Sequence, residues 1–337
     1  MKSCCLHALR VMLKAMLMAG LPWLAIVAIV VSAPASARPV DFSFGAIGQA
    51  INIPNEDSTL EQAITESDAG NLAFIVANGF KRADEPCTDE LYRHRLNLLE
   101  SAKNGLIVSL AAGDWSECKD TSGRSTAVER LSRLRELFFA DEFSLGASKI
   151  PVMRQSSAPK FRSYLENARW EIDNILFATI NLPSDNNHYR MEAGRNSEFE
   201  DRLIANRNWL QRTFSIATSK KMAGIVLFCD ANPFLKPAPR HLFDSSGKRD
   251  GFAEIRQQLG MLANKFPGKV LIVHNQSGSS RAHSGDIAWH GNLGDLELGA
   301  DWIKLSVKVG NKVGNKVGSP AMFTASRGSL DARAPSQ

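Results

Sequence analysis

The 337-residue sequence lacks three features, and each absence excludes a class of protein or site. It has no dense stripe of lysine and arginine, which excludes a nucleic-acid binder held by a basic face, because phosphates would meet no cationic surface. Beyond the N-terminal leader it has no apolar run near the ~20 residues of a membrane helix, which excludes a polytopic membrane protein. It also lacks a Cys-x-x-Cys pair, so no cysteine-based metal site is expected.

The N-terminal 37 residues have the composition of an export signal. Three basic residues precede an apolar run over residues 15–31, and Ala35-Ser36-Ala37 follows where a signal peptidase would cut. We predict a signal peptide over residues 1–37 and a periplasmic or secreted protein. The alternative is an uncleaved leader that anchors the domain in the membrane through residues 15–31. Without the three basic residues of the leader, 37 Lys and Arg face 35 Asp and Glu, a net charge of only +2.

Three cysteines remain after the leader. Cys87 follows the apolar run 72–77, and Cys118 follows the apolar run 106–112. If these runs are adjacent parallel strands, both cysteines lie in loops at one sheet edge, within the ~7 Å Cα separation that a bridge requires. An oxidising compartment then predicts a Cys87–Cys118 disulfide. Cys229 adjoins the apolar run 225–228 and is expected to be a buried free thiol.

Short apolar runs alternate with amphipathic segments, which is typical of β-α-β units. The runs are dense in Ile, Val, Leu and Phe, as expected for strands covered on both faces. The predicted strands span residues 72–77, 106–112, 175–182, 225–229, 270–273 and 302–307. The predicted helices span residues 89–103, 125–139, 197–217 and 252–266. The sequence therefore predicts an α/β protein.

The predicted domain has a hairpin in its middle and extensions at both ends. Residues 168–172 and 175–182 flank Asp173-Asn174, a pair that tolerates positive φ in a tight turn. We assign residues 38–70 to an N-terminal extension and residues 71–307 to the domain. Residues 308–337 repeat Lys-Val-Gly and then lose all periodicity, which predicts a flexible low-complexity tail. A terminal edge strand is the alternative for this segment.

Polar residues that follow the predicted strands are the candidates for a binding site, because ligands gather at the carboxyl ends of strands in open sheets. The candidate pocket comprises Asn78, Asp114, Asn181, Asp230, Asn232, His274 and Asn275. The set is rich in amides and poor in carboxylates. Structural roles are the alternative: Asp114 and Asn232 would form turns, and His274 would be a core imidazole bonded to the backbone.

The order of elements over residues 70–307 resembles the calcineurin-like metallophosphoesterases. That family has Asp-x-His after the first strand, Gly-Asp after the second, Asn-His after the next helix, and further histidines in Gly-His-His-Pro and Gly-His-x-His. Here Gly113-Asp114 matches the second motif, Asp230-Ala231-Asn232-Pro233 stands at the fourth, and His274-Asn275 stands near the last. The resemblance implies a layered α/β/β/α sandwich with a central hairpin.

Most metal ligands of that family are replaced in this sequence. Ala77-Asn78-Gly79 stands for Asp-x-His, and Gly146-Ala147-Ser148 stands for Asn-His. Only Asp114 and His274 remain as candidate metal ligands, and a neutral amide is a weaker ligand than a carboxylate or imidazole. The resemblance thus implies a degenerate member.

Two functions follow from this resemblance. The first, which we favour, is a domain that binds a small molecule or an envelope protein. The second is a phosphoesterase that uses Mn, Fe or Zn, with Asp114 bridging the metals and His274 and Asn232 completing the shell. A similar α/β sandwich of unrelated descent is a third possibility.

Overall fold

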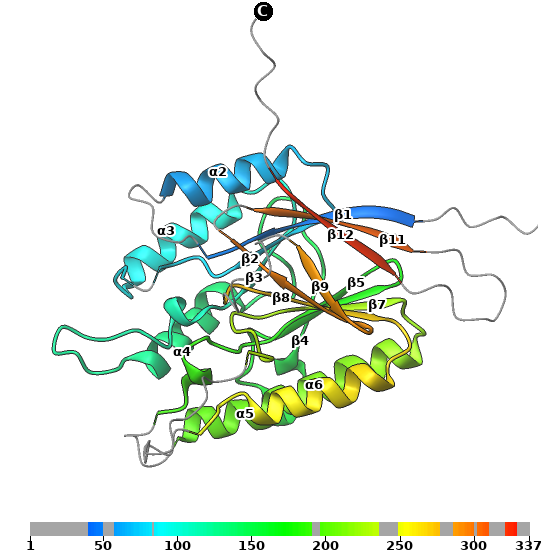
Figure 1. The fold of residues 1–337 in the computed structure, drawn as a ribbon. Coiled ribbons are helices and arrows are strands. Elements are labelled where there is room, and N and C mark those ends of the chain that lie inside the picture. Colours follow the sequence, from blue (N-terminus) through cyan, green and yellow to red (C-terminus); the bar gives the residue numbers. More distant parts are fainter. Residues whose placement is uncertain are drawn as a thin grey trace, which may run out of the picture. The chain divides into compact units, whose positions relative to one another are not determined.

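The computed structural model describes residues 40–49, 57–82, 84–190, 196–235, 249–276, 286–299, 302–309 and 321–328 (Figure 1). The chain divides into two units, Met1–Ala37 and Arg38–Gln337, and only the second contains described residues. The predicted signal peptide therefore lies outside the described residues. Across the described ranges, no helix has the length and apolar character needed to cross a membrane.

Two β-sheets and five α-helices make up the described part of the second unit. One sheet has the order β12-β11-β1-β2-β3, and the other has the order β4-β5-β6-β7-β8-β10-β9. The strands of the first sheet are β1 (Val40–Ile47), β2 (Ile75–Asn78), β3 (Leu106–Ser109), β11 (Ile303–Val309) and β12 (Met322–Arg327). Those of the second are β4 (Met153–Arg154), β5 (Ala168–Ile172), β6 (Ile175–Thr179), β7 (Gly224–Phe228), β8 (Lys269–His274), β9 (Ile287–His290) and β10 (Leu293–Glu297). The helices are α2 (Asp57–Asp68), α3 (Asp89–Glu100), α4 (Ala127–Phe138), α5 (Ser197–Ser219) and α6 (Ala253–Lys265).

The two sheets face each other across an aromatic core, and helices cover their outer faces (Figure 1). Phe74, directly before β2 of the first sheet, stands edge-on to Phe177 of the second, with ring centroids 4.8 Å apart. Along β2, Val76 packs between the sheets while Ile75 and Ala77 pack under the helices. Because both faces of β2 are buried, its residues are apolar as far as Asn78 at its end. The predicted α/β/β/α layering is confirmed.

The central hairpin is present as predicted. Strands β5 and β6 pair antiparallel with Ile172 opposite Ile175, and Asp173 in the turn has a φ of 52°. Strand β6 pairs parallel with β7, and the crossover helix α5 connects the two strands. Helix α3 begins after Thr88, whose hydroxyl accepts the Leu91 N–H, as its sequence indicates.

Both predicted extensions contribute strands to the first sheet. Strand β1 lies between β2 and β11, so residues 40–47 belong to the sandwich and not to a separate extension. Strand β12 pairs antiparallel with β11, so the predicted flexible tail over residues 308–337 is wrong for residues 322–327. These residues form the edge strand that was the alternative, since β12 is the last strand of its sheet. Phe323 holds it in place, because this side chain is only 6% exposed and packs in the core between the sheets.

Strand β12 therefore contributes to stability. We expect Phe323→Ala to lower the free energy of unfolding by about 3 kcal/mol, because it leaves a cavity where the ring packs near Trp289 and Gly224. Urea unfolding of the purified protein measures this loss. The matched control is Met322→Ala, since Met322 is 63% exposed and its truncation removes little buried area. Equal stability of the two variants would show that β12 does not pack as described.

Candidate functional site

The strand ends of the two sheets meet at one edge of the sandwich, where buried polar side chains join them. Asn78, at the end of β2, donates through Nδ2 to the Cys229 carbonyl beyond β7 at 2.7 Å. Asn275, just beyond β8, donates through Nδ2 to the Asn78 carbonyl at 2.9 Å and to Asp230 Oδ1 at 3.0 Å. Both side chains thus make hydrogen bonds between residues that follow strands of the two sheets.

Asp230 is the central acceptor of this arrangement and is only 1% exposed. Its Oδ2 accepts the backbone N–H of Ala112, beyond β3, and that of Ser184, beyond β6, each at 2.8 Å. We call Asn78, Asp230 and Asn275 with these two N–H groups the cross-sheet network. The network satisfies polar groups that would otherwise be buried without partners.

Asp114 is fully buried beside this network and is held by backbone groups. Its Oδ1 accepts the N–H groups of Phe80 and Lys81 at 3.1 and 3.0 Å, and its Oδ2 accepts the Ala111 N–H at 2.8 Å. Burial raises the pKa of Asp114 to about 7, the nearby charge of Asp230 adds to this, and the backbone bonds and Lys81 oppose it. This geometry matches the turn-forming role that the sequence left open for Asp114.

His274 lies in a different cluster. Its Nε2 is 2.9 Å from Asp295 Oδ1, and the same oxygen accepts Asn232 Nδ2 at 3.1 Å. Side chains alternate along a strand, so His274 lies on the same face of β8 as Val270 and Ile272, which pack on the helix side of the second sheet. His274 and Asp114 therefore share no recorded contact among the residues that the structure describes. Asp295 is a partner that the sequence analysis missed, because it lies inside a strand with no motif around it.

Asn181 belongs to a third cluster, which packs α5 onto the hairpin. Its Nδ2 donates to Glu166 Oε1 at 3.1 Å, and its backbone N–H donates to Asn167 Oδ1 at 2.8 Å. Its carbonyl accepts from Arg202 and Asn206. The side chain of Asn181 thus supports the fold and makes no recorded bond to the cross-sheet network.

The side chains at the strand ends do not fit the dinuclear metal centre of the second functional hypothesis. In the described ranges, no group of three or more His, Cys, Asp or Glu side chains could hold a metal ion. The carboxylate oxygens of Asp114 are bonded to three backbone N–H groups, and His274 Nε2 is bonded to Asp295. His274 Nδ1 has no hydrogen-bond partner in the described ranges, but Asp114 is not among the contacts of His274, so the two side chains do not form a shared site for Mn, Fe or Zn.

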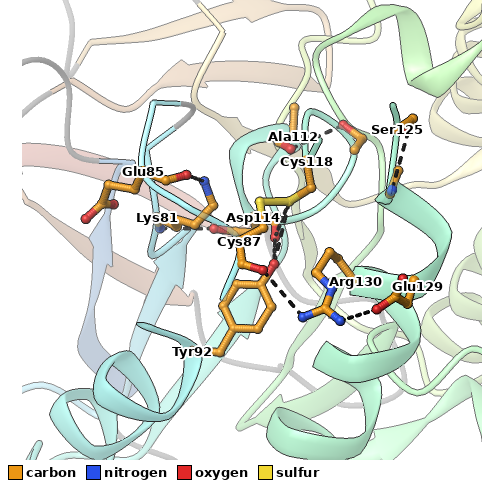
Figure 2. Close-up of a disulfide and its surroundings, with 12 residues drawn as sticks. Lys81, Glu85, Cys87, Tyr92, Ala112, Asp114, Cys118, Ser125, Glu129 and Arg130 are labelled. Carbon is orange, nitrogen blue, oxygen red and sulfur yellow. Dashed lines mark hydrogen bonds and ion pairs between the residues drawn. A yellow bond between two sulfur atoms is a disulfide. The ribbon is translucent and has the colours of Figure 1, made fainter. Parts of the chain in front are cut away.

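The predicted disulfide between Cys87 and Cys118 is confirmed (Figure 2). Their Cα atoms are 5.8 Å apart across a sequence separation of 31 residues. The hydroxyl of Tyr92 lies 3.6 Å from Cys118 Sγ and donates to the Asp114 carbonyl at 2.8 Å. The bridge thus fixes the loop after β2 against the loop after β3. Cys229 is the buried free thiol that the sequence predicts.

A cavity of about 590 Å³ lies against this bridge. Cys87 and Cys118 form one wall, and Glu117, Asp185 and Arg190 are among the other lining residues. Glu117 and Asp185 are not among the site residues predicted from the sequence. No periodicity or motif connects Glu117 to Asp185, which lies in a loop far along the chain.

The cross-sheet network predicts a large effect for Asp230. We expect Asp230→Ala to lower the free energy of unfolding by about 3 kcal/mol, because the Ala112 and Ser184 N–H groups lose their charged acceptor. Urea unfolding checks the loss. Asp201→Ala, which truncates an exposed carboxylate of α5, is the matched control and should leave the unfolding midpoint in place. A similar, small effect of both substitutions would contradict the role assigned to the network.

The disulfide generates a further stability prediction. The Cys87→Ala/Cys118→Ala double variant should lose about 3 kcal/mol, since the bridge closes a loop of this length in the unfolded chain. Thermal unfolding with and without reductant provides the control. Reductant should lower the melting temperature of the wild type towards that of the double variant and leave the double variant unchanged. A wild type that is insensitive to reductant while its thiols are shown to be free would refute the prediction.

Comparison with known proteins gives a fold likeness. No protein-family model matches the chain, and no curated protein matches it in sequence. Among solved structures, it is similar to the calcineurin-like phosphoesterase YfkN from Bacillus subtilis, with 9% identity and a TM-score of 0.37. The match covers 86% of this chain and 91% of that one. At this identity the likeness says nothing of activity, and the layered fold is established by the sheets described above.

Proposed function

We propose that this protein is an exported, non-hydrolytic binding protein of the calcineurin-like phosphoesterase type, which binds its ligand at the strand ends. One observation carries the proposal: the polar residues at these ends are occupied by each other and by the backbone. Asp230 bonds Ala112, Ser184 and Asn275, and Asp114 bonds three N–H groups. They stabilise the sandwich where a phosphoesterase of that type would hold its metals.

The hydrogen-bond energies of Asp114 and Asp230 support a role for these carboxylates in stabilising the fold instead of holding metals. Moving a buried carboxylate from N–H donors to a metal leaves those donors unsatisfied, at a cost of about 1–3 kcal/mol for each group. Asp114 accepts from three such donors, and Asp230 accepts from two backbone donors and one amide, so turning either carboxylate towards a metal would leave some of them unsatisfied. The leader of residues 1–37 and the Cys87–Cys118 bridge support export, because disulfides persist in oxidising compartments. The ligand would be a small molecule or an envelope protein.

Metal content and phosphoesterase activity test the proposal. We expect protein purified from the exporting compartment to contain substoichiometric Mn, Fe and Zn, and to hydrolyse neither aryl phosphate monoesters nor diesters. Stoichiometric metal with turnover that is lost in Asp114→Asn and retained in the surface control Asp201→Asn would overturn it. That outcome would establish the metal-dependent phosphoesterase in its place.

A further inference from the structure

The cavity beside the disulfide has the size of a small-molecule site. Its volume of about 590 Å³ lies within the range of roughly 300–1,000 Å³ that is usual for ligand pockets. Its walls come from the loop that carries Cys87, the loop that carries Cys118, and the segment from Asp185 to Arg190. These segments follow β2, β3 and β6, so both sheets contribute to the cavity.

One wall of this cavity is fixed by the disulfide, and another by a left-handed turn. Asn186, Asn187 and His188 have φ values of 58°, 57° and 53°, a run that is costly for residues with side chains. Arg202, which is fully buried, donates to the Asn187 carbonyl at 2.8 Å and holds the turn in place. Asp185, at the start of the turn, accepts the His188 N–H at 3.2 Å. The walls are therefore ordered before any ligand arrives, which lowers the entropy lost on binding.

The acidic residues of the cavity differ in their partners. Asp185 is 3.2 Å from Arg190, Glu85 is 2.7 Å from Arg95, and Asp84 is 2.6 Å from Arg82. The carboxylate of Glu117 has no recorded hydrogen bond or ion pair within the described ranges, although the side chain is half-buried. Burial, followed by the charges of Asp185 and Asp230, raises the pKa of Glu117. Glu117 is thus a carboxylate that a donor from outside the chain could stabilise.

We propose that this cavity binds the cationic end of a small amine or guanidinium compound, and that Glu117 receives it. The proposal rests on the proposed function and names its ligand class. An anion is disfavoured, because four carboxylates line the cavity against two cations, Lys119 and Arg190. A bare metal ion is disfavoured, since the space greatly exceeds one ion and the described residues offer no cluster of three suitable ligands. A charge-assisted bond to Glu117 is the interaction that remains.

Calorimetric titration with agmatine tests this inference, because agmatine carries a guanidinium and an ammonium group and no carboxylate. We expect agmatine to bind the wild-type protein and to bind Glu117→Gln at least about tenfold more weakly, since one charge-assisted bond is lost. Glu129→Gln, on the exposed surface of α4, is the matched control and should bind as the wild type does. Thermal unfolding of Glu117→Gln verifies that the fold is intact.

The agmatine titration is also repeated over a range of pH. Binding should weaken as the pH falls through the raised pKa of Glu117, because protonation removes the charge that receives the cation. The charged groups that act on this carboxyl are Asp185, Asp230, Lys81 and Arg190. Subtracting the pH dependence of agmatine affinity in Glu117→Gln from that of the wild type isolates the contribution of Glu117. An identical pH profile of the variant and the wild type would overturn the assignment to Glu117.

Three further outcomes would overturn the inference: no binding of agmatine, equal affinity of Glu117→Gln, or tighter binding of inorganic phosphate than of agmatine. These outcomes concern the ligand class alone. The proposed function fails separately, through metal-dependent turnover of phosphate esters, whatever agmatine does.

Discussion

A buried carboxylate at the edge of the sandwich joins the two sheets, and the rest of the strand-end structure depends on it. Asp230 accepts N–H groups from loops that follow β3 and β6, and Asn275 connects it to the end of β2. Aromatic packing holds the middle of the sheets together without directional bonds, so the register of the loops at this edge depends on hydrogen bonds. Fold and site are therefore not independent here. Asp230 and Asn275, polar residues at the strand ends, also hold in register the loops whose neighbours form the walls of the cavity.

The sequence predicted most of the framework, because the framework depends on burial. Strands covered on both faces appear as dense apolar runs, and β2, β3, β6, β7 and β8 were found in this way. The hairpin and the disulfide followed from a turn pair and from two cysteines beyond adjacent strands. Strand β12 was left as an alternative to a flexible tail, since Met322–Arg327 contains polar and small residues. Strand β1 was missed, since Val40–Ile47 also contains polar and small residues and its partner β11 is distant in sequence. Non-local pairing of this kind leaves no local signal.

The candidate site was predicted in part, for a reason that lies in side-chain direction. Asn78, Asp230 and Asn275 do come into contact, as proximity at the carboxyl ends of strands predicts. His274 also ends a strand, yet it follows the helix-side residues of β8, and the alternation along a strand separates it from them. A role for any of these residues in ligand binding stays a prediction. Glu117 and Asp185 lie in irregular loops, where neither periodicity nor a motif indicates which side chains will face each other.

The bridge between Cys87 and Cys118 makes the rigidity of the cavity wall depend on the redox conditions around the protein. Its two loops form a wall of the cavity, and in a reducing cytoplasm they would be joined only by weaker contacts such as that of Arg130 with the Cys87 carbonyl. Under the proposed export, a chain that folded before translocation would lack this cross-link in the cavity wall, and oxidation afterwards would add it. Under the proposed ligand class, cytoplasmic amines would then meet a less rigid cavity than the one that oxidation produces.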